Sequence, residues 1–574
     1  MEMLNGDGRG NGKGYKIVLT GDKCAISNYR GFNWIGFIGC IPSNYPKMPW
    51  NRRIMEDVFF ATKSYDGNGK DDYDEGRLKV APYGIRKVEA ALLEYGFDEK
   101  DVIVADPRKL HKVIGQETKA IGLTVHDPMG YAAVSQLVAC MFRLINWWPA
   151  RSYTAMAFND LITDPLLKRY GSRLIVGGPG IWQLEEHPEK IKEWGIDCLV
   201  DGEAEGIVGR LFDTAVRGER LPAKARGVPM KSDEIPLIRN PSSSGIVEIT
   251  RGCGRGCQFC SPDLLMFRSI PKERILKEVE LEVRHGFRNI TLHSEDALFY
   301  GRKLGSFEIN HDAIVDLWRS VKSFPGVRSV GTDFFSCASV KSSPKTLKAI
   351  AEIMELDEKN PGFVETGLET VSPELVKMIM PGKVKPYTIE EWPDVIDDAL
   401  SILDDNHWFT IASMMTGLPR ESERDVVRCL EFIDRIKHHN VFVWMFPLMP
   451  LRSMRKQAAK WMPEYTPLRQ QLILEATKHS VGMINRHAWT LLKPLPVHLR
   501  FIAYNFLKYV SSKMLEYVKE AEDAIEYKHE DRLMLYKDLE VEVSDEGEAV
   551  MHIAEMVNEL TSLQRLNKDE ASNK

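Results

Sequence analysis

Three cysteines stand close together in the segment RGCGRGCQFC at residues 251–260. Cys253, Cys257 and Cys260 follow the spacing C-x3-C-x2-C, with glycines between the first two. Three thiolates on one tight loop can hold three corners of a [4Fe–4S] cube, which leaves the fourth iron free to bind a small molecule. The glycines let the backbone wrap such a cluster without side-chain clashes. The spacing therefore indicates an iron–sulfur site with one open iron.

Zinc is the main alternative for a group of cysteines. A structural zinc site usually has four ligands, often in two separated pairs, and no Cys or His occurs within twenty residues after Cys260. A disulfide is disfavoured because the nine cysteines are odd in number and six of them are scattered along the chain, as expected for reduced thiols inside a cell. The cluster is therefore the favoured interpretation.

The cysteine loop follows an apolar run at residues 246–250 that predicts a strand, and an aromatic residue, Phe259, precedes the last cysteine. This pattern resembles the radical S-adenosylmethionine (SAM) superfamily. The resemblance implies that the open iron chelates the amino and carboxylate groups of SAM, with Phe259 among the cofactor-binding residues. It also implies that an electron, from a donor such as ferredoxin or flavodoxin, cleaves SAM to a 5′-deoxyadenosyl radical that abstracts hydrogen from a substrate.

A second matching motif lies at the end of the next expected strand, at residues 289–293, which is followed by Ser294, Glu295 and Asp296. Members of the superfamily carry an acidic or glycine motif at this place, which holds the SAM amino group. The resemblance assigns that role to Ser294 and Glu295, and less firmly to Asp296. An ammonium needs such an acceptor, although a solvated turn remains the structural alternative.

Two further motifs match the superfamily. Gly367, Glu369 and Ser372 fit its G-x-E-x-x-S strand, and the resemblance implies that Glu295 and Glu369 are catalytic. The Lys-Gly pair that usually follows is inverted here, to Gly382-Lys383.

The other motif, G-L-P-G-E-T, is matched by Gly417, Leu418, Pro419 and Glu421, while Arg replaces Gly at 420 and Ser replaces Thr at 422. The resemblance implies that the backbone at Gly417 and Pro419 cradles the adenine and ribose of SAM.

The segment before the cysteine loop alternates short apolar runs with helical patterns. The expected strands are 102–105, 121–125, 174–176 and 198–200, and the expected helices are 85–95, 131–142, 185–194 and 205–217. This alternation predicts a doubly wound parallel sheet of the Rossmann or flavodoxin-like type. Ligands of such sheets bind beyond the carboxyl ends of the strands, where the glycine turn at 177–180 and the loop at 201–206 stand.

This segment resembles the cobalamin-binding domain that precedes many radical SAM domains, on the residues Gly177, Gly178, Asp201, Gly202 and Glu205. The resemblance implies that these residues bind cobalamin.

One feature departs from the cobalamin pattern, because the motif D-x-H-x-x-G is absent after the first expected strand, at residues 106–111. A lower axial histidine is therefore in doubt, with His126 or His111 as substitutes, and a degenerate domain that binds nothing is the alternative.

The length and the distribution of motifs predict several domains. We expect an N-terminal extension at 1–77, a cobalamin-binding-like domain at 78–225, a linker at 226–245, a radical SAM partial (β/α)6 TIM-type barrel at 246–455 and a C-terminal helical region at 456–574. Amphipathic helices are expected at 469–484 and 501–518. Docking on the barrel is the simplest role for them, and a lid over the substrate or a peripheral membrane contact is the alternative.

Composition limits the expected binding partners and the expected cellular location of the protein. The net charge of −6 over 574 residues does not indicate nucleic-acid binding. The polar N-terminus is not a signal peptide, and no apolar run reaches 18 residues, so a cytoplasmic protein without spanning helices is expected.

The two resemblances together imply a cobalamin-dependent radical SAM enzyme that functionalises an unreactive C–H bond, with methyl transfer through methylcobalamin as the commonest outcome. The substrate would be a small molecule or a lipid. The alternatives are cyclisation or another C–C bond formation on a membrane lipid, and a cobalamin-independent radical SAM enzyme. A methylthiotransferase is disfavoured because only Cys24 and Cys40 precede Cys140. The motifs for SAM speak against a non-enzymatic iron–sulfur scaffold.

Overall fold

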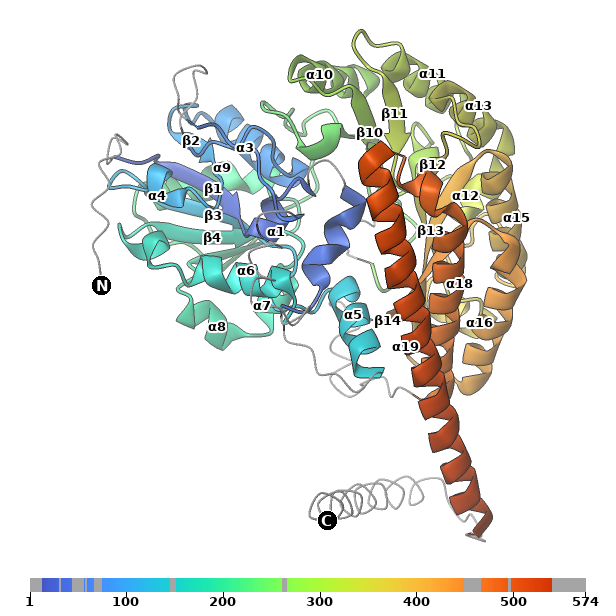
Figure 1. Ribbon diagram of the computed structural model, residues 1–574. Helices are drawn as coiled ribbons and strands as arrows, with labels where there is room; N and C mark the ends of the chain where they lie inside the picture. The colour runs from blue at the N-terminus through green and yellow to red at the C-terminus, as the bar shows by residue number, and fades with distance from the viewer. Residues whose placement is uncertain are drawn as a thin grey trace, which may run out of the picture. The chain divides into compact units, whose positions relative to one another are not determined.

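The computed structural model contains two α/β domains built on parallel strands, followed by two long helices (Figure 1). It describes residues 13–29, 33–43, 56, 59–66, 75–144, 151–260, 266–448, 466–493 and 497–538. Residues 67–74, near the end of the expected N-terminal extension, and the end of the chain after 538 lie outside these residues. The chain divides into two units, Met1–Ala521 and Glu522–Lys574, and both α/β domains lie in the first unit.

The first domain is an all-parallel sheet with the strand order β2-β1-β3-β4-β5-β6. Its strands are β1 (Ile17–Gly21), β2 (Val102–Val104), β3 (Ala120–Thr124), β4 (Arg173–Gly177), β5 (Cys198–Asp201) and β6 (Lys224–Arg226). Helices α3 (Tyr83–Tyr95) and α9 (Glu205–Val216) share one core with the sheet, and α6 (Tyr153–Ile162) and α7 (Ile181–Glu185) share another. The predicted doubly wound sheet is confirmed, because short apolar strands bury both of their faces under helices.

The position of β1 changes the expected domain boundary. This strand comes from the stretch 1–77, expected to be a separate extension, yet it pairs with both β2 and β3 near the middle of the sheet. A boundary at residue 78 therefore divides one sheet. Ile17 of this strand pairs with Val102 and with Ala120, which lie about 85 and 103 residues further along the chain. The sequence of the strand itself does not indicate such distant partners.

The helix expected at 185–194 is interrupted. The structure has α7 up to Glu185 and a separate helix α8 (Pro188–Glu193), which starts with Pro188 at its first turn. Proline lacks the backbone N–H that would continue the earlier helix and fits the first turn of a new one.

The second domain is an arc of six parallel strands, which matches the expected partial barrel. The strands are β7 (Ile246–Glu248), β10 (Asn289–His293), β11 (Ser329–Thr332), β12 (Gly362–Glu369), β13 (Trp408–Thr416) and β14 (Val441–Pro447). They form two three-stranded sheets, β11-β10-β7 and β12-β13-β14, which a parallel bridge between Phe334 and Glu365 connects. A layer of helices covers the strands on the outside of the arc (Figure 1), and strands and helices share one apolar core.

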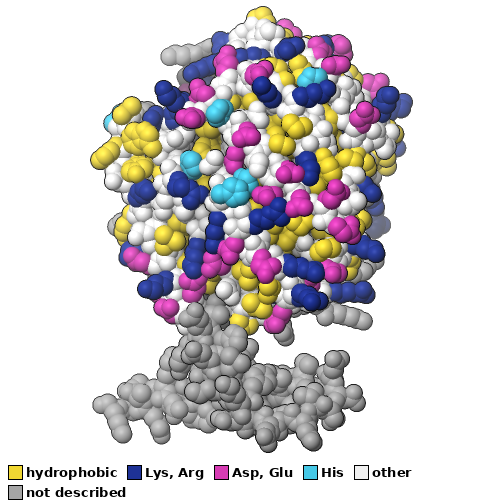
Figure 2. Space-filling model, turned by 90° about the vertical axis from the view of Figure 1, so that its right-hand side faces the viewer, with side chains coloured by type: hydrophobic (Ala, Val, Ile, Leu, Met, Phe, Trp, Pro, Cys, Tyr) yellow, Lys and Arg dark blue, Asp and Glu magenta, His cyan; other side chains and the backbone are white. Residues whose placement is uncertain are grey.

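That outer layer consists of one helix or helix pair after each of the first five strands. It contains α10 (Lys272–Arg284), α11 (His311–Lys322), α12 (Cys337–Ser342), α13 (Pro344–Met354), α14 (Pro373–Ile379), α15 (Trp392–Asp405) and α16 (Glu423–Arg435). On the face drawn in Figure 2, acidic and basic side chains are interspersed, without a large patch of either sign.

The two domains are joined by buried ion pairs. Lys87 of α3 lies 2.7 Å from Glu278 of α10. Glu203, in the loop after β5, accepts a hydrogen bond from Arg251 at 2.9 Å and others from Arg268. Removing one partner of such a buried pair typically costs about 3–5 kcal/mol, because the other charge is left without compensation. The loop after β5 is thereby held against strand β8 (Thr250–Arg251), immediately before the cysteine loop.

The expected linker at 226–245 is packed between the domains. Ile235 and Ile238 are buried, and the carbonyl of Pro236 accepts a hydrogen bond from Lys87 at 2.7 Å. This Pro- and Ser-rich segment is therefore an irregular connection that packs against both domains.

Two long helices follow the barrel: α18 (Pro467–Leu491) and α19 (Val497–Asp538). Leu472, Ile473 and Ala476 of α18 belong to the barrel core, so docking on the barrel is confirmed for this helix. Along α19, Phe501 and Tyr509 are exposed whereas Val518 is buried. Within the described residues, no helix is both long enough and apolar enough to cross a membrane.

Candidate functional site

The cluster loop, defined here as residues 252–260, connects β8 to the antiparallel strand β9 (Arg268–Ser269), with residues 261–265 outside the described part. Gly252, Gly254 and Gly256 have φ angles of +73°, +68° and +74°. These left-handed conformations are costly for residues with a Cβ, so every second residue must be glycine. Cys257 is buried, and Cys253 and Cys260 are half-buried in the same loop.

Arg255, between the first two cysteines, fastens the cluster loop to the barrel. Its guanidinium donates to the carbonyls of Lys383 at 2.9 Å and Lys385 at 3.0 Å and to the hydroxyl of Ser339 at 2.8 Å. The same group forms an ion pair with Asp296 at 3.3 Å. A charged group buried this deeply with several partners holds the loop in one position.

The outer side of the loop has its own support. Arg302 donates to the carbonyl of Cys253 at 2.8 Å and stacks over Phe267 and Phe299, with its guanidinium carbon 4.1 and 4.0 Å from the ring centroids. Gln258 donates through its backbone to Ile379 at 2.8 Å. Contacts within the chain thus hold the cluster loop on both sides.

Glu369 and Lys383 form a buried ion pair of 2.9 Å beside the cysteines. Glu369 has a φ of +63° at an irregularity in the pairing of β12 with β13. A Cβ at Gly367 would lie 2.1 Å from a Glu369 carboxylate oxygen and 2.5 Å from the Lys383 nitrogen. A side chain at 367 would therefore displace the ion pair from its present position.

The order Gly382-Lys383, which is inverted relative to the superfamily motif, is explained by the backbone of Arg255. A Cβ at Gly382 would lie 2.0 Å from the carbonyl oxygen of Arg255. Glycine at 382 lets the barrel backbone approach the cluster loop, and Lys383 then extends toward Glu369.

The charges around the thiols favour one of them as a thiolate. A hydrogen bond from the thiol of Cys260 lowers the pKa of Cys257 to about 7, and the cation of Lys383 adds to this effect. That hydrogen bond and burial raise the pKa of Cys260, and burial raises that of Cys253. Burial alone would lower the pKa of Lys383, but Glu369 and the neighbouring thiols raise it instead. Thiolate sulfur is the ligand that iron–sulfur clusters require, so this set fits the cluster.

The Ser294-Glu295-Asp296 motif stands at the end of β10, and its members differ in their contacts. Ser294 is buried and hydrogen-bonded to Thr250, and Asp296 is buried against Arg255 and Ser339. Glu295 differs from both, because its Oε2 atom is buried and has no hydrogen-bond partner among the described residues. Burial raises the pKa of Glu295 above its usual value. Of the three side chains, Glu295 therefore has an acceptor available for a cation such as an ammonium.

The Gly417–Pro419 loop follows β13 and is closed by Glu421. Gly417, with a φ of +75°, donates its N–H to the Glu421 carboxylate at 2.8 Å, and Arg469 of α18 holds the same carboxylate at 2.7 Å. The helix after the barrel thus fixes the loop that is expected to cradle adenosine.

The residues expected to bind cobalamin make contacts within the chain. A Cβ at Gly178 would lie 2.7 Å from the carbonyl of Val125, and a Cβ at Gly177 would lie 3.4 Å from Val200. Asp201 lies 3.2 Å from Lys224, and Glu205 lies 2.9 Å from Arg251.

Gly202, with a φ of +82°, lies between these two carboxylates. The glycines therefore shape their own turns, and the carboxylates join the loop after β5 to the rest of the chain. His126 and His111 are both exposed.

Sequence reasoning missed four residues of the site. Arg255 and Arg302 are anchors of the cluster loop, and the position of Arg255 between two cysteines was the available signal. His293 and Asp333 form a hydrogen-bonded pair at the ends of β10 and β11. Burial favours the neutral imidazole, but the Asp333 carboxylate outweighs it and raises the pKa of His293 to about 9. This pair can hold a proton beside Glu295.

Comparison with known proteins gives one domain match. The Radical SAM superfamily model matches residues 247–433. The tRNA-2-methylthio-N(6)-dimethylallyladenosine synthase of Desulfosudis oleivorans is 24% identical over 306 residues, which cover 50% of this chain and 60% of that protein. The ribosomal protein uS12 methylthiotransferase RimO of Leptospira biflexa is 28% identical over 206 residues, which cover 36% of this chain and 41% of that protein.

Two solved structures are also similar. The radical S-adenosylmethionine methyltransferase TsrM from Kitasatospora setae, with cobalamin and a [4Fe-4S] cluster bound, has a TM-score of 0.45 at 14% identity over 75% of this chain and 72% of that chain. The cobalamin-dependent S-adenosylmethionine radical enzyme OxsB has a TM-score of 0.48 at 13% identity over 85% and 78%. On the family match and the cysteine loop that it contains, residues 247–433 of this chain form a radical SAM domain.

Proposed function

We propose that the chain is a cobalamin-dependent radical SAM enzyme that acts on an unreactive C–H bond. The observation that carries the radical SAM part is that the three cysteines and Glu295 follow neighbouring strands of one barrel, and that the Oε2 atom of Glu295 has no hydrogen-bond partner among the described residues. When bound, the cluster and SAM together supply a 5′-deoxyadenosyl radical. Cys253, Cys257 and Cys260 would hold the cluster.

The chain's own residues would then orient SAM. Glu295 would accept a hydrogen bond from its ammonium, and the backbone at Gly417 and Pro419 would receive the adenosine. Glu369 stays paired with Lys383 next to the thiols, so it would act by shaping the cofactor pocket. The His293–Asp333 pair can hold a proton at the inner surface of the barrel.

Exchanging Glu295 for glutamine should weaken SAM binding. The change keeps the shape but removes the charge, and one charge-assisted hydrogen bond is worth about 1.5–3 kcal/mol, or roughly ten- to a hundred-fold in affinity. Equilibrium binding of SAM to the cluster-loaded protein measures this. Reductive cleavage to 5′-deoxyadenosine below saturating SAM should fall by a similar factor.

Glu282→Gln is the matched control. Glu282 lies on α10, its Oε2 atom is likewise buried without a hydrogen-bond partner among the described residues, and burial raises the pKa of its carboxyl to about 8. This variant should bind SAM as the wild type does. Equal SAM binding by wild type and Glu295→Gln would show that another group receives the ammonium. Wild-type protein with a full cluster that neither binds nor cleaves SAM would contradict the enzyme class.

Support for cobalamin comes from the sheet and from its connection to the barrel. Parallel doubly wound sheets bind ligands beyond the carboxyl ends of their strands. At that edge, Glu203 and Glu205 are paired with Arg251, two residues before Cys253. A ligand at this edge would therefore lie close to the cluster loop. When bound, methylcobalamin supplies a methyl group for transfer to carbon.

Hydroxocobalamin should bind to the full-length protein, and binding should change the visible absorbance spectrum of the cobalamin. The EPR spectrum of the Co(II) state should lack nitrogen superhyperfine splitting, because no D-x-H-x-x-G motif is present. His126→Ala and His111→Ala should leave the spectrum unchanged. Splitting that disappears in either variant would identify an axial ligand. Protein that does not bind cobalamin at all would support a cobalamin-independent radical SAM enzyme.

The reaction itself is proposed as methyl transfer to carbon, with lipid cyclisation or another C–C bond formation as the alternative. The names of the two relatives refer to a methylthio group on tRNA and on a ribosomal protein. Our proposal for this chain differs in the substrate class. We propose a small-molecule or lipid substrate and an electron donor of the ferredoxin or flavodoxin class. Metabolite and lipid profiles of a deletion strain and its parent would identify the missing product.

A further inference from the structure

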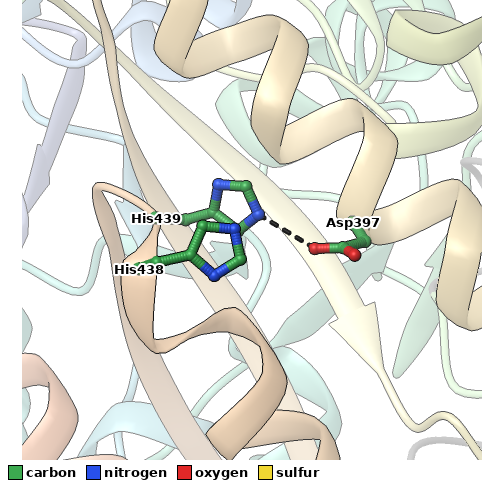
Figure 3. A group of neighbouring side chains, drawn as sticks. All are labelled: Asp397, His438 and His439. Carbon is green, nitrogen blue, oxygen red and sulfur yellow. Dashed lines mark hydrogen bonds and ion pairs between the residues drawn. The ribbon is translucent and has the colours of Figure 1, made fainter.

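A second group of metal-ligating side chains lies on the outside of the barrel, away from the cluster loop. It consists of Asp397 on α15 and of His438 and His439, at the turn that leads from α16 into β14 (Figure 3). One ligand atom from each of the three residues lies within 4.8 Å of the other two. His439 is buried, Asp397 is half-buried and His438 is exposed. The group is therefore open to solvent on one side.

The imidazole of His438 has a nitrogen available for a metal. Its Nδ1 lies 3.0 Å from the backbone carbonyl of Arg435. A carbonyl only accepts hydrogen bonds, so Nδ1 must carry the hydrogen, and Nε2 keeps a lone pair. The His438 ring lies against the His439 ring, with centroids 3.9 Å apart, so this nitrogen lies close to the ligand atoms of His439 and Asp397 (Figure 3).

His439 has the surroundings of a metal-binding histidine. Its Nε2 faces Oδ1 of Asp397 at 2.9 Å, and its Nδ1 faces Oδ2 of Asp404 at 2.7 Å. Histidines that bind metals usually donate their other ring N–H to a carboxylate in this way, which fixes the ring and its tautomer. A cation between Nε2 and Asp397 would take the place of the bridging hydrogen, while Asp404 would keep its contact.

The Asp397 carboxylate is held in a similar manner. Arg435 binds its second oxygen, Oδ2, at 2.8 Å and also pairs with Asp394 at 2.8 Å. Carboxylates that bind metals are themselves commonly hydrogen-bonded by outer groups, and here Arg435 contacts Oδ2 while Oδ1 faces His439. Asp394, Asp397 and Asp404 carry three negative charges, and Arg435 carries one positive charge. Two negative charges therefore remain when both imidazoles are neutral, and one divalent cation balances them.

We propose that Asp397, His438 and His439 bind one divalent metal ion of the zinc class. Two imidazole nitrogens and one carboxylate oxygen are ligands that Zn²⁺ takes at about 2.0–2.2 Å, with water in the remaining position. The site lies where chain segments enter β13 and β14, at the strand ends opposite to the cluster loop. In barrels that end serves stability. The metal therefore fastens α15 to the turn before β14 and takes no part in the radical chemistry.

Zinc binding to the cluster-loaded, full-length protein tests this inference. The cluster must be in place because free cysteine thiols also bind zinc. Equilibrium dialysis against buffered Zn²⁺, followed by metal analysis, should find one zinc per chain. His438→Ala should weaken this binding by about tenfold or more, since even the loss of an outer partner costs that much. Zn²⁺ should raise the thermal unfolding midpoint of the wild type but not of the variant.

His285→Ala is the matched control. His285 is also exposed near the end of a helix with its Nδ1 2.9 Å from a backbone carbonyl, that of Leu281. This variant should bind zinc as the wild type does. Asp397→Asn, which keeps the side-chain shape, should behave like His438→Ala. Zinc retained at one per chain with unchanged affinity in both His438→Ala and Asp397→Asn would overturn the proposal, as would wild-type protein that binds no zinc.

Discussion

Replacing Cys253, Cys257 and Cys260 together by alanine is expected to abolish the iron–sulfur cluster and SAM cleavage completely. The three thiols are the protein's ligands in the proposed site, and they lie in a loop that Arg255 and Arg302 hold in place without a metal. The variant should therefore fold but contain no cluster. Iron and sulfide analysis, visible absorbance and EPR after anaerobic reconstitution measure the effect.

Cys337 and Cys429 provide the control for this experiment. Both are buried in the barrel core, where their thiols contact Thr366 and Thr370. Alanine at either position should leave the iron content at the wild-type level, because buried thiols of this kind act as small apolar groups. Full cluster retention in the triple variant would refute the assignment of the cluster loop.

The second large effect is expected from a single methyl group, in Gly382→Ala. The added Cβ would lie 2.0 Å from the carbonyl oxygen of Arg255, and both sides of this contact are backbone. Neither can rotate away, so the segment around Lys383 must move relative to the cluster loop. The guanidinium of Arg255 would then lose its carbonyl partners at Lys383 and Lys385. Because a misplacement of about 1 Å can cost about 100-fold in rate, SAM cleavage should fall by about that factor.

Gly331→Ala is the matched control, since no described heavy atom lies within 4 Å of the Cβ position at this barrel glycine. Its cluster content and SAM cleavage should equal those of the wild type. Circular dichroism and thermal unfolding separate a local shift from a failure to fold. If folded Gly382→Ala cleaves SAM at the wild-type rate, the close approach of the two backbones is not needed for the site.

The sequence alone was sufficient for features that local chemistry dictates. The spacing of Cys253, Cys257 and Cys260 limits which group they can hold, and the glycines among them meet a conformational need of the loop itself. Short apolar runs alternating with amphipathic helices predicted the parallel sheet of the first domain and the strands of the partial barrel, because each run must bury two faces. These properties depend on neighbours within a few residues, which the sequence lists in order.

Other features depend on residues that are distant in the chain and were decided only by the tertiary structure. Strand β1 joins the sheet through partners about 85 and 103 residues away, as Ile17 pairs with Val102 and Ala120. The pairing of Glu205 with Arg251 joins two domains, and the two residues are 46 positions apart in the chain. Glycine is needed at 382 because the backbone of Arg255 passes there. Burial and charge pairing are sums over neighbours in space, so no pattern along the chain specifies them until the fold has brought those neighbours together.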